Sequence, residues 1–151
     1  MRFVEADFDH PQVADLLNAH VNRARMETGR GSAHALDASG LKASGVRFWT
    51  IWDEDKPVGL GALKVISKDH GEIKSMHTAE GARNKGVGAA MLTHIIAEAK
   101  AMGMSRLSLE TGSWDYFLPA RAFYGRHGFS ECAPFAGYKA DPNSIFMTRT
   151  L

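Results

Sequence analysis

The most informative segment of the sequence is Arg83-Asn84-Lys85-Gly86-Val87-Gly88-Ala89-Ala90. It follows residues 71–78, whose pattern predicts a strand, and it precedes an apolar series at helical spacing that Gly103 ends. The series consists of Val87, Met91, Leu92, Ile95, Ile96, Ala99 and Met102. The basic, glycine-rich stretch is therefore predicted to be a turn that leads from a strand into a helix.

Such a turn can bind an anion. The first N–H groups of a helix have no partner within the helix, and the helix dipole places its positive end there. Gly86 and Gly88 carry no Cβ, so a phosphate can come close to the backbone. The structural alternative is an ordinary helix start that happens to contain glycine.

The spacing argues against two other phosphate-binding loops. A P-loop requires Lys and Ser/Thr after its second glycine, but Val87 and Gly88 follow Gly86. A dinucleotide-binding fingerprint requires a third glycine where this chain has Met91. The pattern that remains is Arg-x-x-Gly-x-Gly/Ala.

With this turn and a second motif, Ala120-x-x-Phe123-Tyr124-x-x-x-Gly128-Phe129, the sequence resembles the GNAT superfamily of N-acetyltransferases. The resemblance covers most of the chain. It implies an α/β fold with a mixed, mostly antiparallel sheet that is splayed between strands 4 and 5, with helices on both faces. It also implies acetyl-CoA as the acetyl donor, with the pyrophosphate of coenzyme A on the turn. A single acetyltransferase domain over residues 1–151 is expected.

Composition and charge narrow the class further. The 151 residues are 44% hydrophobic and 23% charged, as in an ordinary globular domain, and the net charge of +1 argues against a nucleic-acid partner. The single cysteine, Cys132, excludes an internal disulfide and a multi-cysteine zinc site, and no metal is expected. Neither a signal peptide nor a run of ~20 apolar residues is present, so we expect a cytoplasmic protein without a membrane partner. Members of the family often pair, which is compatible with a homodimer.

The remaining elements follow from local patterns. Strands are expected at residues 2–6, 46–52, 57–66, 71–78, 105–111, 129–132 and 144–149, and helices at residues 9–29, 34–45, 87–102 and 119–127. Asp9 is the expected N-cap of the first helix, and His127 is expected to cap the last one. The strand–helix–strand unit at 71–111 predicts parallel neighbouring strands.

The resemblance assigns the coenzyme site to two motifs and their flanks. The expected coenzyme contacts are Met76, His77, Thr78, Arg83, Asn84, Lys85, Gly86, Val87, Gly88, Ala89, Ser113, Phe123 and Arg126. Ser113 stands near the place where the family often carries Asn after the fifth strand, and Thr111 is the alternative for that contact.

Transfer of an acetyl group to an amine needs a proton acceptor, donors for the oxyanion and a proton for the leaving thiolate. In the family the hydroxyl of the tyrosine at position 124 lies near the coenzyme sulfur, so Tyr124 is expected to protonate the thiolate. Glu72 matches a position that some members use as the base, and His77 titrates in a suitable range. Backbone N–H groups around His77 and Thr78 would meet the oxyanion. The structural alternatives are a core tyrosine, a strand-surface carboxylate beside Lys74, and a buried histidine.

The acceptor is less well defined by the sequence. Arg23, Arg25, Arg30 and His34 cluster at the end of the first helix and in the segment after it, and Trp49, Trp52 and Tyr138 are expected to wall the other sides. Because guanidinium groups grip carboxylates, the expected acceptor is a small-molecule primary amine that also bears a carboxylate, such as an amino acid. A solvated helix end is the alternative for the arginines. The alternatives for the whole chain are a peptide or protein amino-group acetyltransferase, and a non-catalytic acyl-CoA-binding or regulatory domain.

Overall fold

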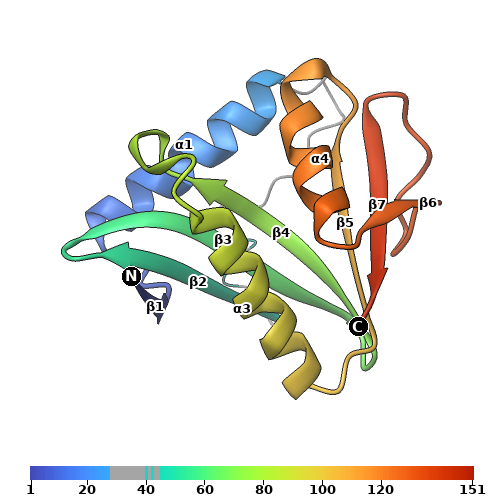
Figure 1. Cartoon of the computed structure of the whole chain (residues 1–151), viewed down its shortest axis with the longest axis horizontal. Helices are drawn as coiled ribbons and strands as arrows, with labels where there is room; N and C mark the ends of the chain where they lie inside the picture. Colours follow the sequence, from blue (N-terminus) through green and yellow to red (C-terminus); the bar gives the residue numbers. More distant parts are fainter. Residues whose placement is uncertain (28–39, 41, 43–44) are drawn as a thin grey trace.

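One mixed sheet forms the centre of the molecule (Figure 1). The computed structural model describes residues 1–27, 40, 42 and 45–151, with the backbone alone for 24–27. In the order in which they lie side by side, the strands are β1 (Arg2–Glu5), β2 (Val46–Asp53), β3 (Lys56–Ser67), β4 (His70–Thr78), β5 (Arg106–Gly112), β7 (Ser144–Thr150) and β6 (Ser130–Cys132). All neighbouring pairs are antiparallel except β4 and β5, which are parallel as predicted.

Helices cover both faces of the sheet, which confirms the expected fold class. The described helices are α1 (Pro11–Glu27), α3 (Val87–Ala101) and α4 (Leu118–Arg126), with short 3-10 turns η1 (Glu80–Ala82) and η2 (Asp115–Phe117). Helices α3 and α4 lie on one face and α1 lies on the other (Figure 1). None of these described helices is both long and apolar enough to cross a membrane.

The two parallel strands are joined at one end only. Their pairing is limited to His70–Arg106, Gly71–Leu107 and Glu72–Ser108. Strand β4 then continues to Thr78 and β5 to Gly112 without further pairing, and Figure 1 shows the two strands diverging. The predicted splay between the fourth and fifth strands is therefore confirmed.

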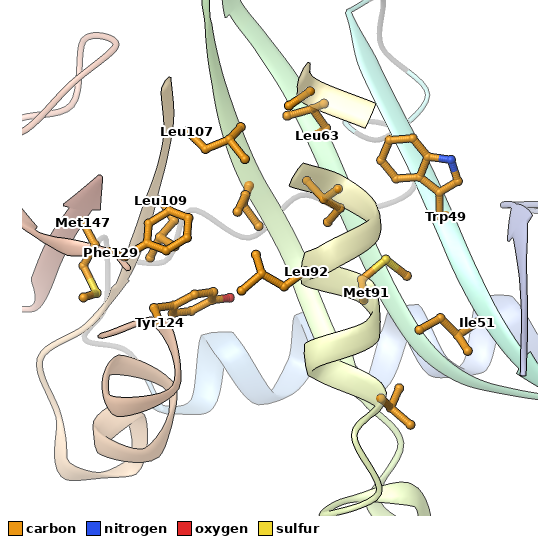
Figure 2. Packing of buried hydrophobic residues seen from close by; sticks show 14 of the residues in the cluster. Trp49, Ile51, Leu63, Met91, Leu92, Leu107, Leu109, Tyr124, Phe129 and Met147 are labelled. Atoms are coloured by element: carbon orange, nitrogen blue, oxygen red, sulfur yellow. The ribbon is translucent and has the colours of Figure 1, made fainter. Parts of the chain in front are cut away.

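The core beneath α3 follows from the apolar series of the sequence. The buried residues of α3 are Val87, Met91, Leu92, Ile95 and Ala99. Figure 2 shows Met91 and Leu92 packed among the core side chains of the sheet. Burial of each large side chain of this kind stabilises the fold by about 1.5–3 kcal/mol. A Cβ on Gly61 of β3 would lie only 2.5 Å from Met91 Cγ, so the glycine lets α3 approach the strand closely.

A smaller core lies on the opposite face. Leu17 and Val21 of α1 pack with Phe48, Leu60 and Ala62 of the sheet. Successive strand side chains point to opposite faces, so β2 and β3 supply both cores from alternate positions.

One predicted helix cap is wrong, and two other helix predictions fall outside the described residues. The Asp9 cap is wrong, because α1 begins at Pro11 and the Gln12 N–H donates to Nδ1 of His10 at 3.2 Å. Pro11 takes the first helical position, which leaves the residue before it as the cap. The predicted helix over 34–45 and the predicted end of the first helix at Gly29 lie outside the described residues.

Candidate active site

The predicted glycine-containing turn is present at the start of α3. Gly86 is the N-cap of the helix with φ of 79°, a left-handed conformation that glycine adopts without strain. Val87 is buried and fixes the first turn to the core, while Arg83 and Lys85 stay exposed. The turn therefore combines anchored backbone N–H groups with accessible cations, which is the chemistry that phosphate needs.

Three elements meet beside this turn. A Cβ on Gly88 would lie 3.6 Å from the Phe123 ring of α4 and 3.9 Å from Thr78 Oγ1 of β4. The structure thus brings Thr78, Gly88 and Phe123 together from separate parts of the chain, as the coenzyme-site prediction requires. Arg126 is three residues beyond Phe123 on α4 and lies on the same side of that helix. Of the other predicted contacts, Asn84 is exposed, Ala89 is partly exposed and Met76 packs partly buried against the core.

Tyr124 lies on the same helix but points inward. Its side chain is buried, and Figure 2 shows its hydroxyl directed toward Leu92 of α3. Burial raises the pKa of Tyr124 well above its ordinary value, so the phenol keeps its proton. Within the described residues no hydrogen bond engages the Tyr124 hydroxyl, so its proton is not held by a protein acceptor.

Strand β4 is irregular where it leaves β5. Its register with β3 shifts between Lys74, opposite Ala62, and His77, opposite Leu60, so β4 contains one extra residue. Ser75, within this bulge, has φ of 57° and a buried hydroxyl that has no partner in the described part of the chain. Bulges re-aim strands near functional sites. Beyond Glu72 no described strand pairs with the β5-facing edge of β4, so that edge opens into the splay.

A buried polar cluster lies where the splay begins. Tyr138, in the loop between β6 and β7, donates its hydroxyl to Glu72 Oε2 at 2.7 Å. The Lys74 ammonium donates to the same carboxylate oxygen at 3.2 Å and to the Tyr138 hydroxyl at 2.9 Å. The side chains of Lys74 and Glu72 are only 7% and 2% exposed. The alternative of a surface carboxylate at Glu72 is therefore wrong, because the carboxylate is buried and paired.

Two histidines lie next to each other on the α1 side. The rings of His20 on α1 and His77 on β4 are 5.2 Å apart. Burial, and then the neighbouring His77, lowers the pKa of His20 to about 4. Burial, and then the Arg83 charge, lowers the pKa of His77 to about 4. Both imidazoles are therefore uncharged at neutral pH. Sequence reasoning missed His20, although its position three residues after Leu17 on the buried stripe of α1 could have indicated it.

Trp49 and Trp52 are not walls of an acceptor pocket, so this expectation is wrong. Trp49 is 2% exposed in the core on the α3 side, and Trp52 donates its indole N–H to Thr50 Oγ1 at 2.9 Å. Both lie on β2, which β3 and β4 separate from the splay. The aromatic composition of the strand reflects packing, whereas the expected wall residue Tyr138 does lie beside the splay.

The predicted arginine cluster is described only in part. The Nε of Arg23 donates to the Tyr116 hydroxyl of η2 at 3.2 Å. The side chain of Arg25, and the whole of Arg30 and His34, lie outside the described residues. Sequence reasoning missed Tyr116, because nothing local links α1 to a residue so far along the chain.

The remaining predicted residues have clear structural partners. Ser113 donates its hydroxyl to the Pro142 carbonyl at 2.6 Å, which ties the end of β5 to the loop before β7. His127 is the C-cap of α4, with its Nδ1 2.8 Å from the Phe123 carbonyl, so the predicted capping role is confirmed. No group of three or more His, Cys, Asp or Glu residues suited to a metal ion occurs in the searched, described residues.

Comparison with known families agrees with the geometry. The model of the acetyltransferase (GNAT) family matches residues 14–129. The chain therefore belongs to this family of N-acetyltransferases. It is 46% identical over 145 residues to the uncharacterized N-acetyltransferase YsnE of Bacillus subtilis, with 96% of each chain covered. It is 40% identical over 145 residues to the uncharacterized N-acetyltransferase YedL of Escherichia coli, covering 96% of this chain and 91% of that protein.

Solved structures share the fold. A crystal structure from Klebsiella pneumoniae, described as a putative acyl-CoA N-acyltransferase, matches with a TM-score of 0.82 and 26% identity, over 99% of this chain and 97% of that one. A GNAT family acetyltransferase from Elizabethkingia anophelis, solved with acetyl-CoA bound, matches with a TM-score of 0.72 and 18% identity, over 99% and 97%. At that identity the second likeness concerns the fold alone.

Proposed function

We propose that this chain is an acetyl-CoA-dependent N-acetyltransferase that transfers the acetyl group to a primary amine of a small molecule by direct attack. The observation that carries the proposal is the splay. Parallel strands β4 and β5 part after three residue pairs, and the glycine turn that starts α3 follows the free end of β4. An extended molecule with an anionic group suits such an opening.

The chain's own residues fit coenzyme A. Arg83, Lys85 and the first N–H groups of α3 would bind the pyrophosphate, because this cationic turn is exposed and its helix is anchored by Val87. Phe123 and Thr78 would flank the ligand beside Gly88. When bound, acetyl-CoA supplies the acetyl group as a thioester.

Two protein groups would stabilise the charges that develop during transfer. Tyr124, a buried phenol with a raised pKa, would donate its proton to the leaving sulfur. A thiol has a reference pKa near 8.5, below that of the phenol, so the thiolate is the weaker base, and the proton that the attacking amine releases would have to restore the one that leaves the Tyr124 oxygen. Backbone N–H groups along the open edge of β4, near the bulge at Ser75, would donate to the acetyl oxygen.

The amine would enter from the α1 side, where the polar side chains gather. Glu72 before the bulge and His77 after it are the two proton acceptors on this part of β4. The uncharged His77 would not repel an ammonium group, and the charge of Lys74 beside it is balanced by the Glu72 carboxylate. The carboxylate-bearing amine expected from the arginine-rich sequence of residues 23–30 remains our proposed acceptor class.

The test is release of free thiol from acetyl-CoA across a panel of primary amines, read with a chromogenic disulfide. The panel pairs each amino acid with its amide and adds a polyamine. We expect amine-dependent release, with amino acids faster than their amides. Equal rates on an amino acid and its amide would reject the carboxylate preference. Binding of acetyl-CoA without release for every amine would reject the enzymatic function and favour an acyl-CoA-binding domain.

A further inference from the structure

One contact connects the two sides of the splay at its open end. Arg23 belongs to α1, which packs over β3 and β4, and Tyr116 belongs to η2, which follows β5. The Arg23 Nε donates to the Tyr116 hydroxyl at 3.2 Å, and the guanidinium carbon stands 5.0 Å from the centre of the Tyr116 ring. We refer to this Arg23–Tyr116 contact as the strap.

The position of the strap follows from helix geometry. His20 of α1 lies against His77, one residue before the end of β4. Arg23 lies three residues further on, about 4.5 Å along the helix and on the same side of it. Tyr116 lies four residues beyond Gly112, the last residue of β5. The strap therefore spans from the free end of β4 to the free end of β5, on the face opposite α3.

The segment that carries Tyr116 is firmly held. A Cβ on Gly112 would lie 2.2 Å from the Phe117 ring, so that ring rests on the strand end and contacts Tyr116 edge-on at 5.0 Å. Arg121 donates to the carbonyls of Gly112 at 2.6 Å and Trp114 at 3.3 Å. Despite this anchoring, Trp114 is 48% exposed and Tyr116 is 38% exposed. An anchored segment that keeps large aromatic side chains in solvent is typical of a binding surface.

A second contact bounds the opposite end of the same opening. The cluster of Glu72, Lys74 and Tyr138 joins β4 to the loop before β7 where β4 and β5 begin to part. The cluster and the strap thus bridge the α1-facing side of the splay at its two ends, within the part of the chain that the structure describes. The Lys74 and Glu72 side chains of the cluster are almost entirely buried, whereas Arg23 and Tyr116 of the strap are exposed and meet through a hydrogen bond and a cation–π contact.

We propose that the strap is a specificity-determining element of the acceptor site, which limits the size of the amines that reach the splay from the α1 side. This inference rests on the proposed function and deepens it. The Tyr116 ring would form the aromatic wall of the acceptor site that was expected from Trp49 and Trp52. Arg23 belongs to the arginine-rich sequence of residues 23–30, and it is the arginine there whose side chain the structure describes. Its guanidinium contacts the Tyr116 ring and suits a carboxylate on the acceptor.

The test compares acceptor selectivity in four variants. Glycine, alanine, phenylalanine and tryptophan serve as amines of increasing size, with KM measured for each amine and for acetyl-CoA. We expect Tyr116→Ala and Arg23→Ala each to raise kcat/KM for the largest amine relative to the smallest by about two- to fivefold, since a contact of this kind is worth roughly 0.5–1 kcal/mol. Tyr116→Phe keeps the ring and should change selectivity less. Arg2→Ala is the matched control, because Arg2 makes a similar contact with Trp52 at 5.4 Å and with the Glu54 carbonyl at 3.3 Å, away from the splay.

The possible outcomes distinguish a failure of the strap proposal from a failure of the proposed function. A changed size preference with an unchanged KM for acetyl-CoA supports the strap. An unchanged preference in both alanine variants, or an equal rise in the KM values for acetyl-CoA and amine, overturns it and indicates a purely structural contact. If the unaltered protein transfers to no amine, the proposed function is overturned and this inference falls with it.

Discussion

The two faces of the splay differ in how their residues are held and in what chemistry they offer. On the α3 and α4 side the splay is lined by an apolar core, and the reactive groups are the glycine turn and one buried phenol, Tyr124. On the α1 side, partly and fully buried polar groups gather, among them His20, His77 and the Glu72–Lys74–Tyr138 cluster. The first face suits a ligand that is bound in the same way in every turnover. The second suits recognition of a particular acceptor.

The hydrogen bonds of two tyrosines, one on each face of the splay, show the same contrast. The Tyr124 hydroxyl makes no hydrogen bond within the described residues, whereas the Tyr138 hydroxyl both donates to Glu72 and accepts from Lys74. Burial raises the pKa of both tyrosines, and the Glu72 carboxylate adds to the effect at Tyr138. One phenol therefore has a proton to give to a ligand, while the other holds a loop against β4.

The largest expected effect is a loss of turnover, and it should occur at Tyr124 and not at Tyr138. Tyr124→Phe should lower turnover by roughly 10²–10⁴-fold, the usual contribution of a positioned proton donor, with coenzyme A affinity unchanged. Steady-state thiol release and calorimetric binding of coenzyme A measure the two quantities. Tyr138→Phe is the comparison variant and should chiefly raise KM for the amine. Equal losses of turnover and coenzyme affinity in Tyr124→Phe would mean that the tyrosine is only structural.

The next effect is on stability, and it comes from the Glu72–Lys74–Tyr138 cluster on the α1 side. Lys74→Met leaves the 2%-exposed Glu72 carboxylate without its cation, which should lower the free energy of unfolding by about 3–5 kcal/mol. Urea denaturation measures this loss. The control is Lys64→Met, because Lys64 lies opposite Glu72 on β3 but is exposed, and it should change stability by no more than about 0.5 kcal/mol. Adding Glu72→Gln to Lys74→Met should recover most of the loss. A stable Lys74→Met protein would show that Glu72 is not held as the distances indicate.

The histidine pair gives a further effect, visible as a pH dependence of stability. The pKa values of His20 and His77 are lowered from 6.5 to about 4 in the folded protein, so the unfolded chain binds more protons between these values. The free energy of unfolding should therefore fall as the pH drops from about 6.5 toward about 4. Denaturation midpoints at pH 7, 6 and 5 measure the slope, and His20→Leu should reduce it. An unchanged slope in that variant would contradict the burial of the pair.

Local patterns were sufficient to predict the backbone structure on the proposed coenzyme side. The Arg83 turn, the helix that begins at Val87 and the α4 motif around Phe123 are each contained in one short segment, so spacing alone gives their structure. The parallel pairing of β4 and β5 followed from the strand–helix–strand order. These features depend on backbone geometry that neighbouring residues determine.

The acceptor side could not be predicted in the same way, because its contacts join distant residues. Tyr138 meets Glu72 and Tyr116 meets Arg23 across the fold, and nothing in either local sequence indicates its partner. The wrong assignment of Trp49 and Trp52 arose because an aromatic strand looks alike whether it lines a pocket or a core. The strand order decides between the two, since β2 is separated from the splay by β3 and β4.

Binding of coenzyme A to the turn before α3 is the basis of the proposed function, and calorimetric titration of coenzyme A measures it. Arg83→Glu places a negative charge beside the pyrophosphate and should weaken binding by roughly 10- to 100-fold, because a charge-assisted hydrogen bond is worth about 1.5–3 kcal/mol. Lys100→Glu changes the net charge equally at the exposed far end of the same helix and should bind like the unaltered protein. Equal affinities in the Arg83→Glu variant and the unaltered protein would contradict the account.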